Sequence, residues 1–432
     1  MDTQFSEKVY PVTFRATEAK VLGEHVRLRH NVELVGMLHV GIRNFLRFFL
    51  YQDHIIPTYI NHDEKHMFVH VDLNDLVARD IASFWNLVFS RLVDSVEASG
   101  LDVSSKAQIT KLFEASSKSA DLFSTIDSLR KSVGLVVAAG ILPTLFFVRF
   151  DRIKDAINSE FYTNLEGLRD SSGHQLAYVF TSFRPLNNIS PEVFSKKSLS
   201  GFSHLMYVKP AINGDVRVVF DMFEKKYNLS LSDTISNKLL ELVGGHVKYL
   251  HIAVSILKEK REGDLFENIA KNEKINFLSE EIWESLNTEE QRILTTIFKK
   301  GIKQSISEAD KKVGDYLWQT GIIGEKNGVF CIFSPLFEYF IQQRVEGGKP
   351  NGSLDFTKKE NLLYNFLIAN IGQICEREQI ITTVWGDDNA GVTDWTVDQL
   401  VARLRTKLKL QKSKYQVVTV KTRGYRMEGE GN

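Results

Sequence analysis

The sequence predicts a multidomain α/β protein: a parallel sheet covered by helices on both faces, followed by helical units and small hairpins. Three observations support this fold class. A chain of 432 residues is longer than a single hydrophobic core usually organises. In its first part, short apolar runs alternate with longer amphipathic stretches, which is typical of parallel strands joined by helices. In its later parts, helical patterns are followed by short hairpin signals.

The composition is that of an ordinary soluble protein, with 43% apolar residues, 25% charged residues and a net charge of zero. No apolar run approaches the roughly 20 residues that a membrane helix needs. The amino-terminal stretch "MDTQFSEKVYP" has no apolar core of a signal peptide. Cys331 and Cys375 have no metal-type spacing, which indicates reduced thiols. We therefore expect a cytoplasmic protein with no membrane partner and no metal site.

Residues 15–195 are predicted to form the sheet domain. Buried strands are expected at 31–36, 67–73, 144–150 and 176–183, and amphipathic stretches such as "RDIASFWNLVFSRLVDSVEA" supply the helices between them. Ligands of such sheets bind beyond the carboxyl ends of the strands. The stretch "VGMLHVGIRN" follows the first strand at that edge.

Further domains are expected after the sheet, which should have no strand beyond about Ser198. The predicted order is a helical domain at 196–270, a winged helix at 271–344, a linker rich in Gly, Pro and Asn at 345–353, and a last domain at 354–432. Within 271–344, Thr288 is the expected N-cap of a helix. A second helix ends at Gly321, and Asn327-Gly328 is the expected turn of a hairpin.

The stretch "VGMLHVGIRNFL" has the frame of a phosphate-binding loop, because Gly36 follows a strand and Gly41 opens a helix. Such a loop holds phosphates with backbone N–H groups, a lysine, and a hydroxyl group that binds Mg²⁺. Ile42 stands where the lysine belongs, and Arg43 stands where the hydroxyl belongs. The frame is therefore kept while the chemistry is lost.

A second acidic motif is lost as well. The strand "TLFFVRFDRI" puts Arg149 and Phe150 near the positions where metal-binding and water-activating acids belong, and its one acid is Asp151. Metal binding and water activation are therefore both expected to be absent. Two independent losses argue against chance divergence of one motif, so we expect no catalytic residue in this part of the chain.

The region from about 15 to 345 resembles the archaeal-type ATPases of the AAA+/STAND group. The resemblance lies in the loop frame and in "FVHVDL", "LFFVRFDRI", "YVFTSFRPL" and "LVGGHVKYLHIAVSIL". It implies a P-loop-NTPase-like sheet, a helical lid and a winged helix. The polar side chains at the sensor position are Thr181, Ser182 and Arg184. They are interpreted as caps of the strand end and turn formers. His246 is interpreted as a packing or capping residue.

The carboxyl-terminal module carries an uneven charge. From Arg403 to Arg426 there are nine basic residues and no acidic one, which predicts a polyanionic partner. A helix over "TDWTVDQLVARLRTKLKL" has an apolar face of Val397, Leu400, Val401, Leu404 and Leu408. Its opposite side carries Gln399, Arg403, Thr406 and Lys407. Asp398, the acid in the first turns of this helix, is expected to interact with the helix amino terminus.

The stretch "FTKKENLLYNFL…CEREQIITTVWGD…TVDQLVARLRTKL…VVTVKTRGYRM" resembles the winged-helix DNA-binding domain of OmpR/PhoB-type response regulators. Thr357 and Glu360 form the expected capping box of the first helix. The amino-terminal sheet of that family has almost no room after the linker, and no phosphoacceptor receiver domain is recognisable upstream.

The resemblance implies the DNA contacts. Gln399 and Arg403 would face base edges in the major groove, and Arg405 and Lys407 would meet phosphates. Thr419, Lys421 and Arg423 belong to the predicted wing, and the family usually has Arg in place of Lys421. Independently, guanidinium groups match guanine edges, and lysines supply the salt-dependent attraction to phosphates.

The predicted function is that of a sequence-specific transcription regulator. It would bind double-stranded DNA through 354–428, self-associate, and have RNA polymerase as a further candidate partner. The first part would be a non-hydrolysing pseudo-ATPase, with no cofactor expected. One alternative is a STAND-type switch that binds ATP or ADP with at most weak hydrolysis, and another is a protein-interaction scaffold that uses its winged helices.

Overall fold

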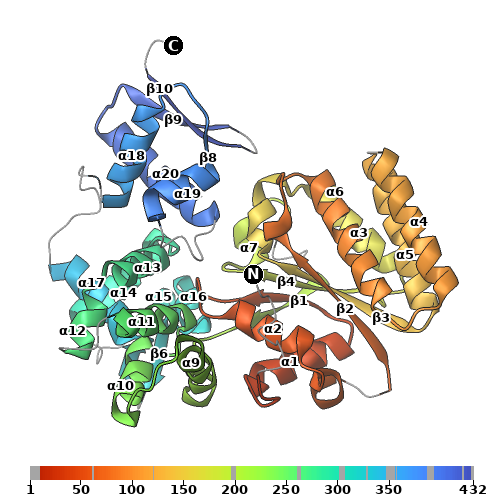
Figure 1. Ribbon diagram of the computed structural model, residues 1–432, viewed down its shortest axis with the longest axis horizontal. Coiled ribbons are helices and arrows are strands. Elements are labelled where there is room, and N and C mark those ends of the chain that lie inside the picture. Colours follow the sequence, from red (N-terminus) through yellow and green to blue (C-terminus); the bar gives the residue numbers. More distant parts are fainter. Residues whose placement is uncertain are drawn as a thin grey trace. The chain divides into compact units, whose positions relative to one another are not determined.

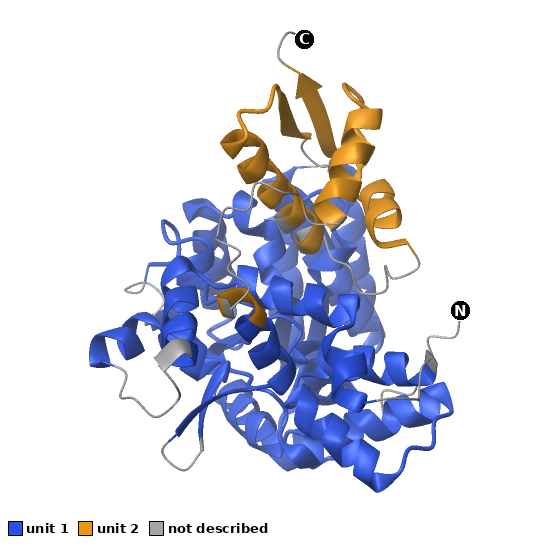
Figure 2. Ribbon diagram, turned by 90° about the vertical axis from the view of Figure 1, so that its left-hand side faces the viewer, with its two compact units in different colours: residues 1–342 blue, residues 343–432 orange. Residues whose placement is uncertain are grey.

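The computed structural model describes residues 10–60, 63–119, 121–195, 201–259, 264–300, 307–326, 329–346, 356, 358–386, 394–420 and 423–429. The chain divides into two compact units, unit 1 at 1–342 and unit 2 at 343–432 (Figure 2). Among the described residues, no helix combines the length and the apolar character needed to cross a membrane.

Unit 1 is built on a five-stranded sheet in which every pairing is parallel. The strands are β1 (Asn31–Val35), β2 (Lys65–Asp72), β3 (Ile141–Val148), β4 (Ala177–Ser182) and β5 (Ser203–Tyr207), in the order β2-β3-β4-β1-β5. The four predicted strands are confirmed. The expectation that strands stop near Ser198 is wrong, because β5 pairs with β1 at the sheet edge. Its sequence, Ser-His-Leu-Met-Tyr, is short and half polar, so it lacks the apolar run of a central strand.

Helices cover both faces of this sheet (Figure 1). The helices of the sheet region are α1 (Ala16–Arg27), α2 (Ile42–Tyr51), α3 (Ile81–Glu97), α4 (Val103–Ser119), α5 (Leu122–Ala138), α6 (Ser159–Ser171) and α7 (Leu186–Ile189). Short helical turns occur at Ile56–Ile60, Leu73–Asp75 and Phe150–Ala156. Alternation along the strands assigns the faces. Phe68 and Phe146 pack against Phe49 of α2, so the intervening strand residues face α3, α5 and α6.

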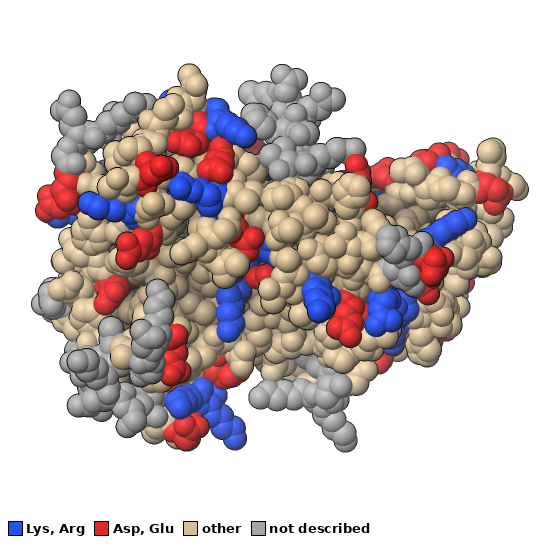
Figure 3. Space-filling view, turned by 90° about the horizontal axis from the view of Figure 1, so that it is seen from below, with Lys and Arg blue, Asp and Glu red and all other residues tan. Residues whose placement is uncertain are grey.

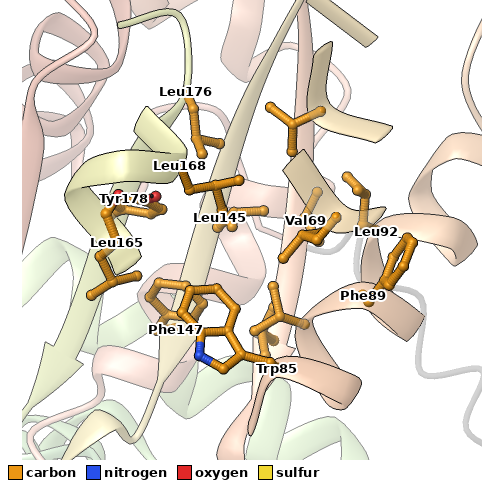
Figure 4. Close-up of a cluster of buried hydrophobic side chains, with 14 of the residues drawn as sticks. Val69, Trp85, Phe89, Leu92, Leu145, Phe147, Leu165, Leu168, Leu176 and Tyr178 are labelled. Atoms are coloured by element: carbon orange, nitrogen blue, oxygen red, sulfur yellow. Dashed lines mark hydrogen bonds between the residues drawn. The ribbon is translucent and has the colours of Figure 1, made fainter. Parts of the chain in front are cut away.

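The larger core lies on that second face (Figure 4). Val69 and Leu145 from neighbouring strands meet Trp85 and Phe89 of α3 there, and all four are fully buried. Phe147 stacks on Tyr178 at a ring-centroid distance of 5.7 Å. Aromatic side chains bury large areas, so this layer fixes β2, β3 and β4 against the helices of the second face.

The rest of unit 1 is mainly helical: α9 (Asn213–Tyr227), α10 (Asp233–Val243), α11 (Val247–Glu259), α12 (Leu265–Ala270), α13 (Glu273–Glu284), α14 (Thr288–Lys300), α15 (Glu308–Val313), α16 (Asp315–Gln319) and α17 (Pro335–Glu346), with a hairpin of β6 (Ile323–Lys326) and β7 (Val329–Ile332). The predicted hairpin is confirmed, although its turn lies outside the described residues.

Thr288 is not the N-cap of α14. Asn287 is, because its Oδ1 accepts from the Glu290 N–H and the Glu290 carboxylate accepts from the Asn287 N–H, both at 2.9 Å.

Unit 2 contains three helices and a three-stranded antiparallel sheet of order β8-β10-β9. Its elements are α18 (Lys358–Ala369), β8 (Cys375–Glu376), α19 (Arg377–Trp385), α20 (Asp394–Leu410), β9 (Tyr415–Val420) and β10 (Gly424–Gly429). Glu376 and Gln379 form a capping box at the start of α19. The predicted helices and wing are confirmed, while Thr357 lies outside the described residues.

Candidate functional site

The loop between β1 and α2 has a structural reason for each of its glycines. A Cβ added to Gly36 would lie 2.9 Å from the carbonyl oxygen of Val208, and one added to Gly41 would lie 2.6 Å from Cγ2 of Val247. Gly41 also has a φ of 112°, a conformation that other residues rarely adopt. Close packing is thus enough to require glycine at both positions.

His246, the residue before α11, forms a hydrogen bond with the loop. The fully buried ring of His246 donates from Nε2 to the carbonyl of Leu38 at 2.8 Å, and its Nδ1 accepts the N–H of Tyr249 at 3.2 Å. One neutral tautomer satisfies both bonds. Burial lowers the pKa of His246 to about 3, so the ring stays neutral. His246 is therefore a capping and packing residue, as predicted.

The two glycines before His246 serve the same packing. A Cβ on Gly244 would lie 1.8 Å from the carbonyl oxygen of Phe333, and one on Gly245 would lie 2.1 Å from that of Ala211. Both glycines have positive φ angles. The "GGH" sequence is thus explained by close backbone approaches and by the bond from His246 to the loop.

The carboxyl ends of β2 and β3 carry an internal ion pair where acids and a metal would belong. Arg149 donates from Nε to Oδ1 of Asp72 at 3.0 Å and from Nη2 to Oδ2. Its backbone N–H donates to Oγ1 of Thr181 at 2.9 Å. Burial alone would raise the pKa of Asp72, but the hydrogen bonds from Arg149 outweigh it and the pKa is lowered. The carboxylate is thus ionised and already paired with a cation.

Ile42 and Arg43 form the first turn of α2, beside this ion pair. Burial and then Arg149 lower the pKa of the Arg43 guanidinium, while Asp72 acts in the opposite direction. Phe150 is fully buried, and burial raises the pKa of Asp151 to about 6. Two arginines, Arg43 and Arg149, therefore stand beside the Asp72 carboxylate, which is unfavourable for Mg²⁺.

The residues at the sensor position also make internal contacts. Arg184 donates from Nη1 and Nη2 to the two carboxylate oxygens of Glu290, at 2.8 and 2.7 Å, and its guanidinium lies 3.7 Å from the ring centroid of Tyr316. Glu290 is 2% exposed. The Ser182 hydroxyl donates to the Arg184 carbonyl. Sequence reasoning missed Glu290 as the partner, because the pair spans 106 positions of the chain.

In unit 2, helix α20 has the predicted division into two faces. All five residues of the predicted apolar face are at most 3% exposed: Val397, Leu400, Val401, Leu404 and Leu408. On the opposite side, Thr406 and Lys409 are exposed and Arg403 is half-buried. Gln399 belongs to the same helix, but its side chain lies outside the described part. The helix thus presents polar and cationic side chains to solvent.

Two of the predicted phosphate contacts are engaged within the unit. Arg405 donates to the Val417 carbonyl at 2.8 Å and to the Thr419 hydroxyl at 2.7 Å. Both predicted residues Arg405 and Thr419 therefore tie α20 to the wing strand β9. The Lys407 ammonium lies 2.7 Å from the carboxylate of Glu360, which is 1% exposed. Lys407 thus neutralises a buried acid of α18.

Other cations remain at the surface of this module. Arg423, at the base of β10, keeps 60% of its side chain exposed, and its guanidinium lies 3.9 Å from the carboxylate of Glu376. Lys409, Lys412 and Lys414 are exposed as well. Lys421 lies outside the described residues. Arg423 and these three lysines therefore remain for a polyanion without counting Arg405 or Lys407.

A network that sequence reasoning missed joins α19, α20 and β10. The Asp398 carboxylate accepts from Nη2 of Arg377 at 3.2 Å and from the Tyr425 hydroxyl at 2.5 Å. The Arg377 guanidinium also lies 5.0 Å from the centre of the Tyr425 ring. Asp398 therefore binds side chains of neighbouring elements, and its expected interaction with the helix amino terminus stays a prediction. The only sequence signal was the acid itself.

One face of the molecule, drawn in Figure 3, shows Lys and Arg interspersed with Asp and Glu. Interspersed charges of both signs are typical of a solvated surface without a strong single-sign field. The acid-free run from Arg403 to Arg426 differs from this pattern.

Comparison with known proteins identifies the carboxyl-terminal segment. Residues 351–427 match the family model described as "Transcriptional regulatory protein, C terminal", which confirms the OmpR/PhoB-type resemblance of this domain. The chain is similar to the heme response regulator HssR of Staphylococcus aureus strains JH9 and Newman, at 38% identity over 87 residues. The match covers 20% of this chain and 38% of the length of those relatives.

Solved structures resemble a larger share of the chain. The Walker-type ATPase PABY2304 of Pyrococcus abyssi matches 78% of this chain and 99% of its own, at 14% identity and a TM-score of 0.45. The ORC2 protein of Aeropyrum pernix, in its ADPNP–ADP complexes, matches 80% of this chain and 97% of its own, at 11% identity and a TM-score of 0.40.

Proposed function

We propose that this protein is a sequence-specific transcription regulator that binds double-stranded DNA through unit 2. The observation that carries the proposal is the family match at 351–427 on a module whose α20 and wing expose cations in an acid-free segment. Helices of this kind read base edges in the major groove. The protein would work in the cytoplasm, as a self-associating regulator that acts on RNA polymerase.

We expect two kinds of contact at this interface, base contacts and phosphate contacts. Arg403 on α20 supplies a guanidinium that matches the O6 and N7 atoms of guanine. Arg423 and the lysines after α20 supply attraction to phosphates, which weakens as salt rises. Arg405 acts differently, since its bonds to Val417 and Thr419 hold the wing against the helix.

We further propose that unit 1 is a non-hydrolysing module for sensing or assembly. Three arrangements support this: the Arg149–Asp72 pair at the metal position, the bond from His246 to the loop carbonyl, and the packing of Val247 on Gly41. Arg149 and Arg43 would repel Mg²⁺, and the Asp72 carboxylate is already paired with Arg149.

Selection of bound duplexes from a random DNA pool by the full-length chain tests the first proposal. We expect enrichment of one motif, and a pair of direct half-sites if two copies bind in tandem. The matched control is Arg403→Lys, which keeps the charge and removes the guanidinium fork. Failure of the full-length chain to enrich any motif at low salt would rule out sequence-specific binding and favour a scaffold.

The second candidate function is an ATP- or ADP-binding switch. The observation that favours it is the pair of arginines, Arg43 and Arg149, at the carboxyl ends of the strands. Repeating the selection with ATP and measuring nucleotide affinity by calorimetry distinguishes the two candidates. Binding that disappears in Arg43→Ala would support the switch, whereas no measurable heat from ATP or ADP supports the non-hydrolysing, nucleotide-free module.

A further inference from the structure

Three histidines meet at the edge of the sheet of unit 1, near the amino ends of β1 and β5 and so opposite the loop that follows β1. His25 lies near the end of α1, His30 precedes β1, and His204 lies on the edge strand β5. One imidazole nitrogen from each lies within 4.8 Å of the others. This is the one group of metal-ligating residue types found in the described part of the chain. Sequence spacing gave no signal of it, because His204 is distant in the chain.

The end of α1 brings the first two rings together. The His30 N–H donates to the His25 carbonyl at 2.9 Å and the Arg29 N–H donates to the Val26 carbonyl at 3.1 Å, while Arg29 has a φ of 56°. These are the bonds of a Schellman motif, in which the side chains at the positions of His25 and His30 contact each other. The Nδ1 atoms of the two rings are 3.2 Å apart.

Arg29 holds this turn in place. Its guanidinium donates to the Val26 carbonyl at 3.2 Å, to the Thr144 hydroxyl at 3.1 Å and to the Gln175 carbonyl at 2.8 Å. A residue other than glycine in the left-handed region costs about 1 kcal/mol or more, and these bonds offset that cost. These bonds therefore fix the turn that holds the His25 and His30 rings next to each other.

Parallel pairing of β5 with β1 supplies the third ring, with His204 opposite Val32. The His204 ring lies 4.3 Å from that of His30 and 4.8 Å from that of His25, between ring centroids. His204 is exposed, so its side chain can turn with little loss of packing. A fourth position would face solvent beside it.

We propose that His25, His30 and His204 bind a divalent transition-metal ion, with Zn²⁺ as the fitting example. Two imidazole nitrogens on one tetrahedral Zn²⁺ ion, each at 2.0–2.1 Å, are about 3.3–3.4 Å apart, close to the 3.2 Å between the Nδ1 atoms. Imidazole suits Zn²⁺, Cu²⁺ and Ni²⁺. The ion would replace the hydrogen bond between His25 and His30, draw the His204 ring out of its stack, and join α1 to the edge strand.

Two further observations agree with this site. Burial, and after it the neighbouring histidines, lower the pKa of His25, which favours the neutral ring that a metal needs. The charged groups whose fields reach the cluster are Glu24 and Arg169. Glu24 favours a cation there and Arg169 opposes it, so the affinity would come mainly from the three nitrogens.

Calorimetric titration of the metal-free full-length chain with Zn²⁺ tests the proposal. We expect one ion per chain, and an affinity at least about tenfold weaker in His204→Gln, because one of three ligands is gone. The variant His174→Gln is the matched control, since His174 is exposed and lies outside the cluster; it should bind like the wild type. Because His204 is exposed, the variant should fold like the wild type, and thermal melting without metal checks this.

A second readout uses Co²⁺ as the probe. A four-coordinate Co²⁺ site absorbs visible light much more strongly than a six-coordinate one, so the wild type and His174→Gln should show the intense band and His204→Gln should lose it. Equal Zn²⁺ affinity in the wild type and His204→Gln, or no uptake by the wild type at equimolar Zn²⁺, would overturn the proposal. In either case the cluster would be only a stacked and hydrogen-bonded edge.

Discussion

The loop of unit 1 and helix α20 of unit 2 both carry residues that resemble a known site, yet their side chains are used differently. In the loop region, Arg149 and Arg184 bond to Asp72 and Glu290, and His246 bonds to the loop backbone. In unit 2, Arg405 and Lys407 also turn inward, but Arg423 and three lysines stay exposed. A motif whose polar groups pair with one another is a structural element, and one that leaves cations at the surface still has charge to offer a partner.

This difference has an energetic basis. A buried ion pair contributes little net stability, but it is costly to break because the remaining charge has no partner. An exposed cation contributes little to folding and keeps its charge for a polyanion. Substitutions in the loop region should therefore change stability, and substitutions on the exposed side of unit 2 should change DNA binding.

The largest effect is expected for Arg184→Ala. It leaves the Glu290 carboxylate buried at 2% exposure without its guanidinium partner, so we expect a loss of about 3–5 kcal/mol in the free energy of unfolding. Chemical denaturation measures it. The double variant Arg184→Ala/Glu290→Gln should recover part of the loss, and a single variant as stable as the wild type would contradict the internal role of Arg184.

The second-largest effect is expected for Gly41→Ala. We expect a loss of roughly 2–4 kcal/mol in the free energy of unfolding, because alanine would be strained at the positive φ of Gly41 and its methyl group would be overpacked. The methyl group would meet Val247, so adding Val247→Ala should relieve the clash while the backbone strain remains. Denaturation without nucleotide provides the measurement. If Gly41→Ala is neutral until ATP is added, the glycine serves a phosphate rather than packing.

Arg403→Ala should weaken specific DNA binding by about 1–3 kcal/mol and relax selectivity at one position of the site. Fluorescence anisotropy with the selected duplex and with single-base variants measures both. Lys111→Ala on α4 is an exposed control in unit 1 and should leave binding unchanged. Equal losses on every duplex would assign Arg403 to phosphate contact instead.

His246 should make stability depend on pH. Burial lowers its pKa to about 3 in the folded state, whereas the unfolded value is about 6.5. The unfolded state therefore binds the proton first, and stability falls as the pH drops below 6.5. This contribution is about 1 kcal/mol between pH 6.5 and 5.5.

Comparing the pH profiles of the wild type and His246→Gln isolates this contribution from that of other histidines. The variant should be less stable at pH 8 and should show a smaller decline on acidification. Parallel profiles would mean that the ring accepts a proton in the folded protein, against the tautomer inferred from its two hydrogen bonds.

The smallest effect is expected for Arg423→Ala. Because Arg423 is exposed, stability should not change, and DNA affinity should weaken similarly for all sequences. The slope of log affinity against log salt should become shallower by about 1, which corresponds to one phosphate contact. An unchanged slope would remove Arg423 from the interface.

Much of the fold was predictable because periodicity is local. The apolar runs that became β1 to β4 and the apolar face of α20 from Val397 to Leu408 are readable in the sequence alone. The edge strand β5 was not, since its alternation of polar and apolar residues is weak. The N-cap at Asn287 was misplaced by one residue, because the choice between Asn287 and Thr288 depends on backbone geometry that composition does not reveal.

The sequence by itself determined which residues stand in the loop and after the third strand, namely Ile42, Arg43, Arg149 and Phe150, and that the segment from Arg403 to Arg426 is basic and acid-free. Only the tertiary structure decided what these residues contact and which cations remain available. Asp72 meets Arg149 across 77 positions of the chain, Glu360 meets Lys407 across 47, and His204 joins His25 and His30 through strand pairing. Such partners are chosen by packing between distant segments, and a pattern read along the chain contains no information on which distant side chain will occupy the neighbouring space.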